Sequence, residues 1–222
     1  MLPWEWVVDE HRTGERVPSW DDPEDFARSV VRQYRRDRWI TQPRQVEIWS
    51  EKGTIRGTLA PILSWSGVTL RVMHGYSSAT IVHKVAEWTS YLDKPLLVFY
   101  IGDWDPSGMH MSEVDLPRRL EDYGGKVSIR RLALTDEDIW DGQLPSFPAE
   151  EKQTDARYQW FVERYGQTCW ELDALSPAVL RARLEAALFE IIDREEWQRC
   201  MEAEEAEQRS LKEVLNRWSK TA

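Results

Sequence analysis

Three carboxylic acids directly follow segments that have the length and composition of buried strands. Glu51 comes just after QVEIW (45–49), and Asp103 and Asp105 come just after PLLVFYI (95–101). Carboxylates in such positions can hold a hard divalent cation or exchange a proton with a substrate. Three of them at one place repel one another strongly unless a cation lies between them. The expected ligand is therefore Mg²⁺ or Mn²⁺.

Each of these acids also has an ordinary structural interpretation. A D-x-D pattern after a strand often serves a turn and a helix cap, and a glutamate at a helix start complements the helix dipole. A second acidic pair, Glu171 and Asp173, competes as a further metal site. The alternative is that this pair caps the helix that is expected to begin at Ser176 and Pro177.

The elements that must position the acids alternate between strand and helix. Strands are predicted at 45–49, 68–73, 95–101 and 126–134, with amphipathic or apolar helical segments between them. This alternation predicts an α/β fold with a doubly wound, Rossmann-like parallel sheet. Sites in such sheets lie outside the carboxyl ends of the strands, where the three acids are expected.

The chain is expected to have three parts. Residues 1–44 form a helical N-terminal segment, and residues 45–134 form the sheet domain. Residues 135–222 form an extension with a polar loop, a strand at 167–175 and one long helix from Pro177 to about Trp218. The end of that helix offers apolar residues that suit either a homodimer contact or a solvated tail.

Charge limits the partners of the protein. The net charge of −10 argues against binding nucleic acid by bulk attraction. Residues 27–45 nevertheless hold six arginines and one aspartate, so Arg35 and Arg36 are expected to contact DNA, unless this run is a solvated helix face. No apolar stretch reaches the roughly 20 residues that a membrane span needs. No secretory leader pattern is visible, and we expect a cytoplasmic protein.

Two motifs carry a resemblance to a known family. The segments HGYSSAT (74–80) and YIGDWDPSG (100–108), with the glutamate after the first strand, resemble the Toprim domain of the topoisomerase VI A subunit and of meiotic double-strand-break enzymes. The similarity covers about residues 45–134. Ser77 and Ser107 stand where that pattern has a proline and an aromatic residue.

The resemblance implies that Glu51, Asp103 and Asp105 bind one or two magnesium ions and carry catalysis. Two further groups of residues are candidates because of their positions near these acids. Lys52 and Arg56, one helical turn apart, suit phosphate binding or plain solvation, and His74 ends the second strand level with the acids. Glu113, on the following helix, faces either the site or solvent.

The implied function is magnesium-dependent cleavage of DNA phosphodiesters by a nuclease or a topoisomerase-like subunit. In the resembling families a winged-helix domain carries a nucleophilic tyrosine, whereas Tyr34, in an amphipathic segment here, is expected to be a packing residue. Two alternatives therefore stay open. One is a metal- and DNA-binding accessory module whose winged-helix or ATPase partner supplies the nucleophile. The other is a scaffold subunit of a defence or mobile-element complex.

Overall fold

The computed structural model describes residues 17–73 and 79–219. Within this part of the chain, contacts define two compact units. The sheet unit runs from Arg44 to Ile191. The helical unit combines the segment that ends at Pro43 with the segment that begins at Ile192. No helix in the described ranges is long and apolar enough to cross a membrane.

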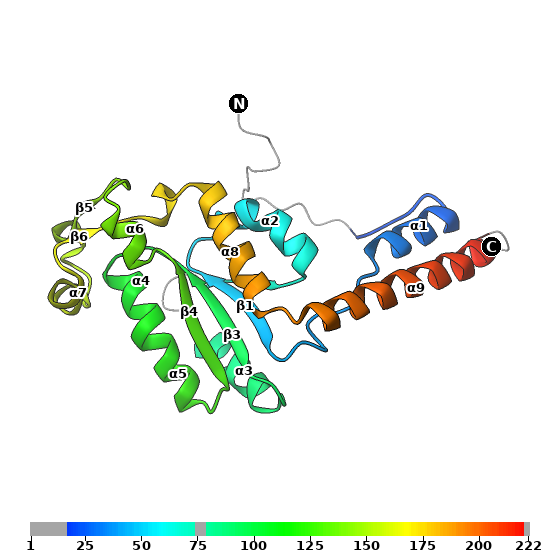
Figure 1. Ribbon diagram of the computed structural model, residues 1–222, viewed down its shortest axis with the longest axis horizontal. Coiled ribbons are helices and arrows are strands. Elements are labelled where there is room, and N and C mark those ends of the chain that lie inside the picture. The colour runs from blue at the N-terminus through cyan, green and yellow to red at the C-terminus, as the bar shows by residue number, and fades with distance from the viewer. Residues whose placement is uncertain (1–16, 74–78, 220–222) are drawn as a thin grey trace. The chain divides into compact units, whose positions relative to one another are not determined.

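The sheet unit is built on four parallel strands (Figure 1). They are β1 (Gln45–Ser50), β2 (Thr69–Val72), β3 (Leu96–Ile101) and β4 (Val127–Ala133). Their order is β2-β1-β3-β4, and all neighbouring pairs are parallel. The predicted α/β, doubly wound fold is confirmed. The direction of winding reverses between β1 and β3, so the crevice outside their carboxyl ends is the topological switch point of the sheet.

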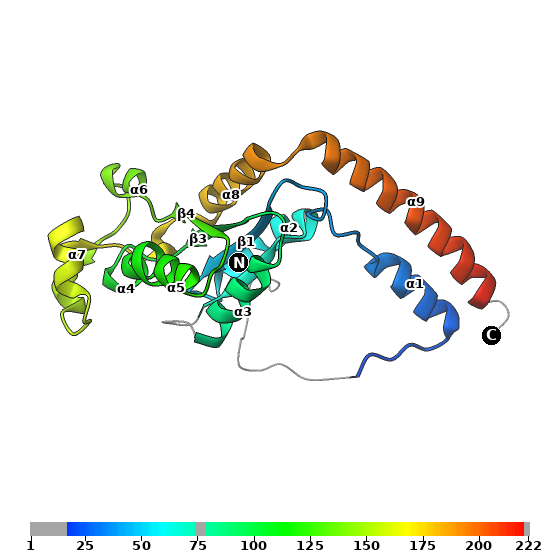
Figure 2. The same ribbon diagram turned by 90° about the horizontal axis from the view of Figure 1, so that it is seen from below.

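Helices cover both faces of this sheet (Figures 1 and 2). The main ones are α2 (Ile55–Ser66), α3 (Ala79–Ser90), α5 (Leu116–Asp122) and α8 (Pro177–Ile191). Helices α3 and α5 pack together on one face, and α2 and α8 pack together on the other. Trp65 of α2 stacks on Phe189 of α8, with ring centroids 5.3 Å apart.

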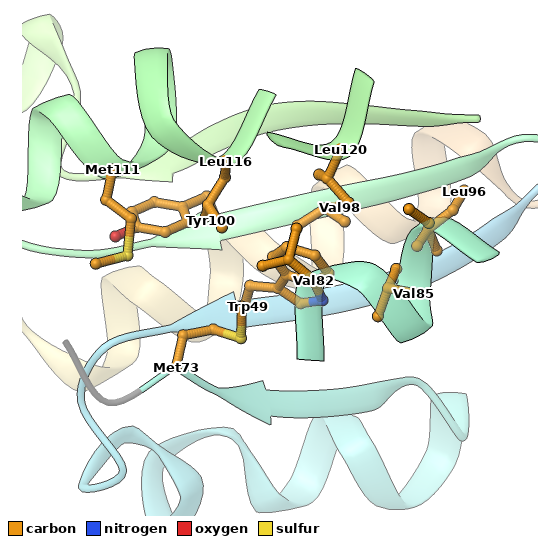
Figure 3. Packing of buried hydrophobic residues seen from close by; sticks show 11 residues of the cluster. Trp49, Met73, Val82, Val85, Leu96, Val98, Tyr100, Met111, Leu116 and Leu120 are labelled. Carbon is orange, nitrogen blue, oxygen red and sulfur yellow. The ribbon is translucent and has the colours of Figure 1, made fainter. Parts of the chain in front are cut away.

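The position of β3 in the core explains why its sequence is an uninterrupted apolar run. All six of its residues are buried because helices cover both of its sides. Figure 3 shows Trp49, Val98 and Tyr100 of the sheet packed against Val82 of α3 and Leu116 of α5. Tyr100 is fully buried, although its ring ends in a polar hydroxyl that needs a partner.

One charged residue inside the sheet has a structural role. Glu47 on β1 is 5% exposed, accepts a hydrogen bond of 2.6 Å from the Trp49 indole, and receives two from the Arg71 guanidinium at 2.6 and 2.9 Å. A buried carboxylate is tolerated when it is paired and hydrogen-bonded in this way. Its oxygens are thus occupied within the sheet.

The helix expected after β3 is present in three pieces. These are α4 (Pro106–His110), the π-helical turn η2 (Met111–Asp115) and α5 (Leu116–Asp122). Pro117 lies in the first turn of α5, where its missing N–H costs little. The π-helical turn η2 directly before it allows the helix to be interrupted there without a break in the chain direction.

The rest of the sheet unit follows β4. It contains α6 (Asp136–Trp140), β5 (Phe147–Pro148), η3 (Ala149–Lys152), α7 (Tyr158–Tyr165), β6 (Thr168–Cys169), η4 (Leu172–Ala174) and α8. The strand expected at 167–175 is wrong in length, since β6 has two residues paired antiparallel to β5 and the chain then turns into η4.

The helical unit pairs α1 (Pro23–Gln33) with α9 (Arg194–Ser219). The single helix expected from Pro177 is broken at residues 192–193. Asp193 there begins α9, because its carboxylate accepts hydrogen bonds from the N–H groups of Glu195 and Glu196 at 3.0 and 3.1 Å. The Gln42 amide also bonds the backbone N–H and carbonyl of Asp193, which leaves these groups unavailable for a continuous helix.

A part-buried ion pair fastens α8 to α6, the helix after β4, and its loss should be measurable. Two Arg183 nitrogens donate to Asp138 at 2.6 and 2.7 Å. Burial raises the pKa of Asp138, but the hydrogen bonds from Arg183 and the Thr135 backbone outweigh it and hold the pKa below its usual 3.8. Asp138→Asn should therefore lower the free energy of unfolding by about 2–3 kcal/mol in urea titrations at neutral pH.

The sign of the pH dependence follows from the depressed pKa. The charged carboxylate contributes fully above its unfolded-state pKa, and the contribution is lost as the pH falls through the folded-state pKa. The gap between wild type and Asp138→Asn should thus narrow below pH 3.8. Glu190→Gln is the matched control, since the exposed Arg130–Glu190 pair also joins β4 to α8 and should cost at most about 1 kcal/mol. An equal loss of stability in Asp138→Asn and Glu190→Gln would contradict this structural role of the Arg183–Asp138 pair.

Candidate metal centre

The three predicted acids follow the carboxyl ends of β1 and β3, on either side of the switch point of the sheet. Glu51 follows β1 directly, and its Oε1 accepts a hydrogen bond of 2.6 Å from the Tyr100 hydroxyl of β3. Burial raises the pKa of Glu51, and repulsion from Asp105 and Asp103 raises it further. The three carboxylates therefore act on one another electrostatically.

Backbone hydrogen bonds fix the two aspartates. Asp105 is 6% exposed and caps α4, its Oδ1 accepting from the Gly108 N–H at 2.8 Å. The Asp103 Oδ1 accepts from the Leu172 N–H at 2.7 Å. The cap interpretation of the D-x-D pattern thus holds for Asp105, and the two aspartates still share one loop beside Glu51. Burial raises the pKa of Asp103.

Lys52 is the central cation of the site. Its Nζ lies 3.1 Å from Asp103 Oδ1, 3.0 Å from Asp173 Oδ2 and 3.6 Å from Glu171 Oε2. Burial opposes its charge, but the ion pairs outweigh burial and raise the pKa of Lys52. The second predicted acidic pair, Glu171 and Asp173, therefore adjoins the first cluster through this lysine and forms no separate centre in the described residues.

A second lysine, which was not predicted from the sequence, contacts the site from a distant part of the chain. Lys152, at the end of η3, places Nζ 3.3 Å from Asp105 Oδ2. Burial again opposes the charge, and the attraction of Asp105 outweighs it, so the pKa of Lys152 is raised. Both lysines are held in the ammonium form by the carboxylates that they contact.

Arg131 of β4 is the residue that shapes the acidic loop. Its guanidinium donates to the carbonyls of Gly102 at 2.9 Å, Gly108 at 3.1 Å and Leu134 at 2.6 Å, and to the carbonyl of Asp103. It also donates to a hydroxyl of the π-helical turn η2 at 2.7 Å. A Cβ added to Gly108 would lie 2.5 Å from the Asp103 carbonyl oxygen, so only glycine fits where the loop folds back on α4.

A short backbone pairing explains why residues 171–173 reach the site. Trp104 and Trp170 exchange two backbone hydrogen bonds, at 2.9 and 3.0 Å. The Trp104 ring contacts Tyr165 edge to face, and Tyr165 contacts Trp160. This aromatic cluster fastens α7 against the acidic loop.

The remaining predicted residues lie elsewhere. Arg56 is exposed on the first turn of α2, and His74 lies outside the described residues. Glu113 accepts a hydrogen bond from the Tyr165 hydroxyl. Its carboxylate is therefore engaged beside the aromatic cluster.

The predicted DNA contacts lie in the helical unit. The Arg36 guanidinium pairs with Glu207 of α9, and Arg35 is exposed and donates to the carbonyls of Arg32 and Tyr34. The Tyr34 hydroxyl also donates to Glu207, at 2.7 Å. This hydrogen bond raises the pKa of Tyr34, which agrees with a packing role.

The donor chemistry of the cluster suits a hard cation such as Mg²⁺, which prefers carboxylate oxygens. Among the residues that the structure describes, however, no three His, Cys, Asp or Glu side chains are gathered to hold one metal ion. Asp103 and Asp105 instead pair with the ammonium groups of Lys52 and Lys152, and Glu51 accepts the hydrogen bond from the Tyr100 hydroxyl. Glu51, Asp103 and Asp105 are the residues that would hold a cation once these ion pairs open.

Comparisons with protein-family models and with curated proteins found no match to this chain.

Proposed function

We propose that this protein cleaves DNA phosphodiesters with the help of magnesium at a Toprim-like site formed by Glu51, Asp103 and Asp105. The observation that carries the proposal is the convergence of three carboxylates at the β1/β3 switch point, two of them with raised pKa values. Carboxylates whose pKa values are raised by burial and by neighbouring charges beside a ligand crevice are typical of functional sites. DNA as the substrate rests on the motif resemblance.

The side chains would divide the work as follows. A bound Mg²⁺ would stabilise the charge that develops on the phosphodiester oxygens. Glu51, oriented by the Tyr100 hydroxyl at Oε1, can accept a proton at its other carboxylate oxygen, and its raised pKa makes it a stronger base than an ordinary glutamate. Lys52 would bind a phosphate oxygen beside Asp103.

A second function has one observation in its favour. The lysine ammonium groups lie where a cation would bind, as expected for a protein that no longer uses metal and keeps the fold as a binding module or scaffold. Such a module would need a partner to supply any nucleophile.

Supercoiled plasmid separates the two functions. We expect nicking or linearisation that depends on Mg²⁺ or Mn²⁺ and stops with EDTA. The control is Glu113→Gln, which removes a carboxylate of the same unit that is bonded to Tyr165, and it should cleave normally. Absence of cleavage at any protein concentration, with or without added metal, would contradict the enzyme and favour the binding module or scaffold.

A further inference from the structure

We propose that the groove between α1 and α9 binds the phosphate backbone of a DNA strand, with Arg32, Arg209 and Lys212 as the residues that contact it. This inference rests on the proposed function, because that function identifies DNA as the anion that the protein binds. It concerns the helical unit by itself and involves no metal ion, so DNA binding there can be measured without cleavage.

The groove lies between two helices from opposite ends of the described chain. Helices α1 and α9 lie side by side (Figures 1 and 2). Two hollows of about 300 and 290 Å³ adjoin each other there, since Val31 and Lys212 line both of them. We call the two hollows together the α1/α9 groove. Side chains of α1 form one wall of this groove, and side chains of α9 form the other.

Positive charge predominates along this groove. Among the described residues that line it, four are cations and one is a carboxylate: Arg28, Arg32, Arg209, Lys212 and Glu205. Arg28 pairs with Glu24 of its own helix at 2.8 Å. Arg32, Arg209 and Lys212 are exposed and have no carboxylate partner in the part of the chain that the structure describes. Because the whole chain has a net charge of −10, an anion would be attracted locally to this groove and not to the protein as a whole.

The spacing of the cations favours an anion with regularly repeated charges. Arg28 and Arg32 are four residues apart on α1, and Arg209 and Lys212 are three apart on α9, so each pair lies on one helix face with Cβ atoms about 5–6 Å apart. A nucleic-acid strand presents phosphates at regular intervals, and a positively charged groove can follow its backbone. The guanidinium groups add a fork of donors that matches phosphate oxygens.

The apolar part of the groove is too short for an acidic helix of another protein. Ala27 and Val31 are the apolar residues of its lining, and they lie one helical turn apart on α1. An amphipathic helix that docks in a groove uses apolar anchors that extend over about two turns, at i, i+3 or i+4, and i+7. A phosphate backbone needs no such anchors, and it therefore fits the groove better.

These contacts differ from those predicted from the sequence. Arg36 pairs with Glu207 of α9, whereas Arg32 lies one turn earlier on α1, beside Lys212 in the lining of the groove. The cations of the groove come from both ends of the described chain, so the arginine-rich segment supplies only one of its walls.

The test is fluorescence anisotropy of a labelled oligothymidylate of about 20 nucleotides, longer than a typical single-strand site, with the full chain in EDTA. The variant Arg32→Gln/Lys212→Gln removes one cation from each wall. Its affinity should be about tenfold lower than that of the wild type at about 0.1 M salt. The slope of log K against log salt should become shallower by about 1.4, because each phosphate contact to a single strand contributes about 0.7.

The matched control is Lys84→Gln/Arg118→Gln. These two residues are exposed on α3 and α5 of the sheet unit, and their replacement removes the same net charge. The control should bind oligothymidylate with the affinity and salt slope of the wild type. Glutamine has a helix propensity close to that of lysine and arginine, and thermal denaturation of each variant verifies that the fold is retained.

The possible outcomes either support the inference or overturn it. A lower affinity and a shallower salt slope in the groove variant alone support it. Equal affinity in the wild type and the groove variant, or equal losses in both double variants, overturns it. Competition by poly-L-glutamate at lower concentration than by unlabelled oligothymidylate also overturns it and favours an acidic protein as the partner.

Failure of this inference is distinguishable from failure of the proposed function. If the wild type does not bind oligothymidylate but cleaves plasmid in the presence of metal, the inference is overturned and the proposed function stands. If it binds through the groove but does not cleave, the groove is supported and the enzyme is contradicted. Absence of both binding and cleavage overturns both proposals.

Discussion

Asparagine at positions 103 and 105 is expected to lower metal-dependent plasmid cleavage by about a thousandfold while the protein stays folded. Loss of the two charges would remove ligands of the proposed cation, which would contribute several kcal/mol of transition-state stabilisation. The amide oxygens can still accept the hydrogen bonds from the N–H groups of Leu172 and Gly108, and asparagine caps helices about as well as aspartate does.

Alanine at position 105 separates chemistry from structure. Asp105→Ala should also abolish cleavage, but it removes the cap of α4 and should cost about 1 kcal/mol of stability in addition. Cleavage rates and stabilities in urea should therefore be compared between Asp105→Ala and Asp103→Asn/Asp105→Asn. Near-normal cleavage by Asp103→Asn/Asp105→Asn would show that the acids serve only as caps and ion-pair partners.

Replacing Arg131 by methionine should lower the free energy of unfolding by about 3–5 kcal/mol. The guanidinium is the shared donor for carbonyls before, within and after the acidic loop, and buried carbonyls that lose a donor cost about 1–3 kcal/mol each. Methionine fills a similar volume, so the loss reports the hydrogen bonds more than a cavity. Urea denaturation followed by tryptophan fluorescence measures it.

The neighbouring arginine provides the control for this prediction. Arg130→Met removes an exposed guanidinium that pairs with Glu190 and should cost at most about 1 kcal/mol. If Arg131→Met gives no folded protein, Arg131→Lys keeps the charge but only part of the fork of donors and should fall between the two. Equal stability of wild type and the Arg131 variants would contradict the role of this side chain.

Much of the sheet could be predicted because its signals are local. The apolar run of β3 is the pattern of a strand that is covered on both faces, and the acids that follow β1 and β3 must meet when those strands are parallel. The convergence of Glu51, Asp103 and Asp105 is a consequence of chain direction, so strand positions alone predict it.

The parts that the sequence did not predict depend on contacts between distant residues. Lys152 reaches Asp105 only because β5 and β6 pair and Trp170 bonds Trp104, and none of these short pairings leaves a periodic pattern. The break before α9 depends on the Gln42 amide, about 150 residues earlier in the chain. Arg131 gave no specific signal, because the exposed Arg130 stands beside it in the same strand.

The pairing of α1 with α9 has a consequence for how the chain folds during synthesis. Helix α1 is made first and α9 last, with every strand of the sheet unit between them. The sheet unit can complete its core while α1 still lacks its partner. The Arg38 side chain can pair with Glu204, which it contacts at 3.0 Å, only after α9 has been made. Closure of the helical unit is thus a late, long-range step.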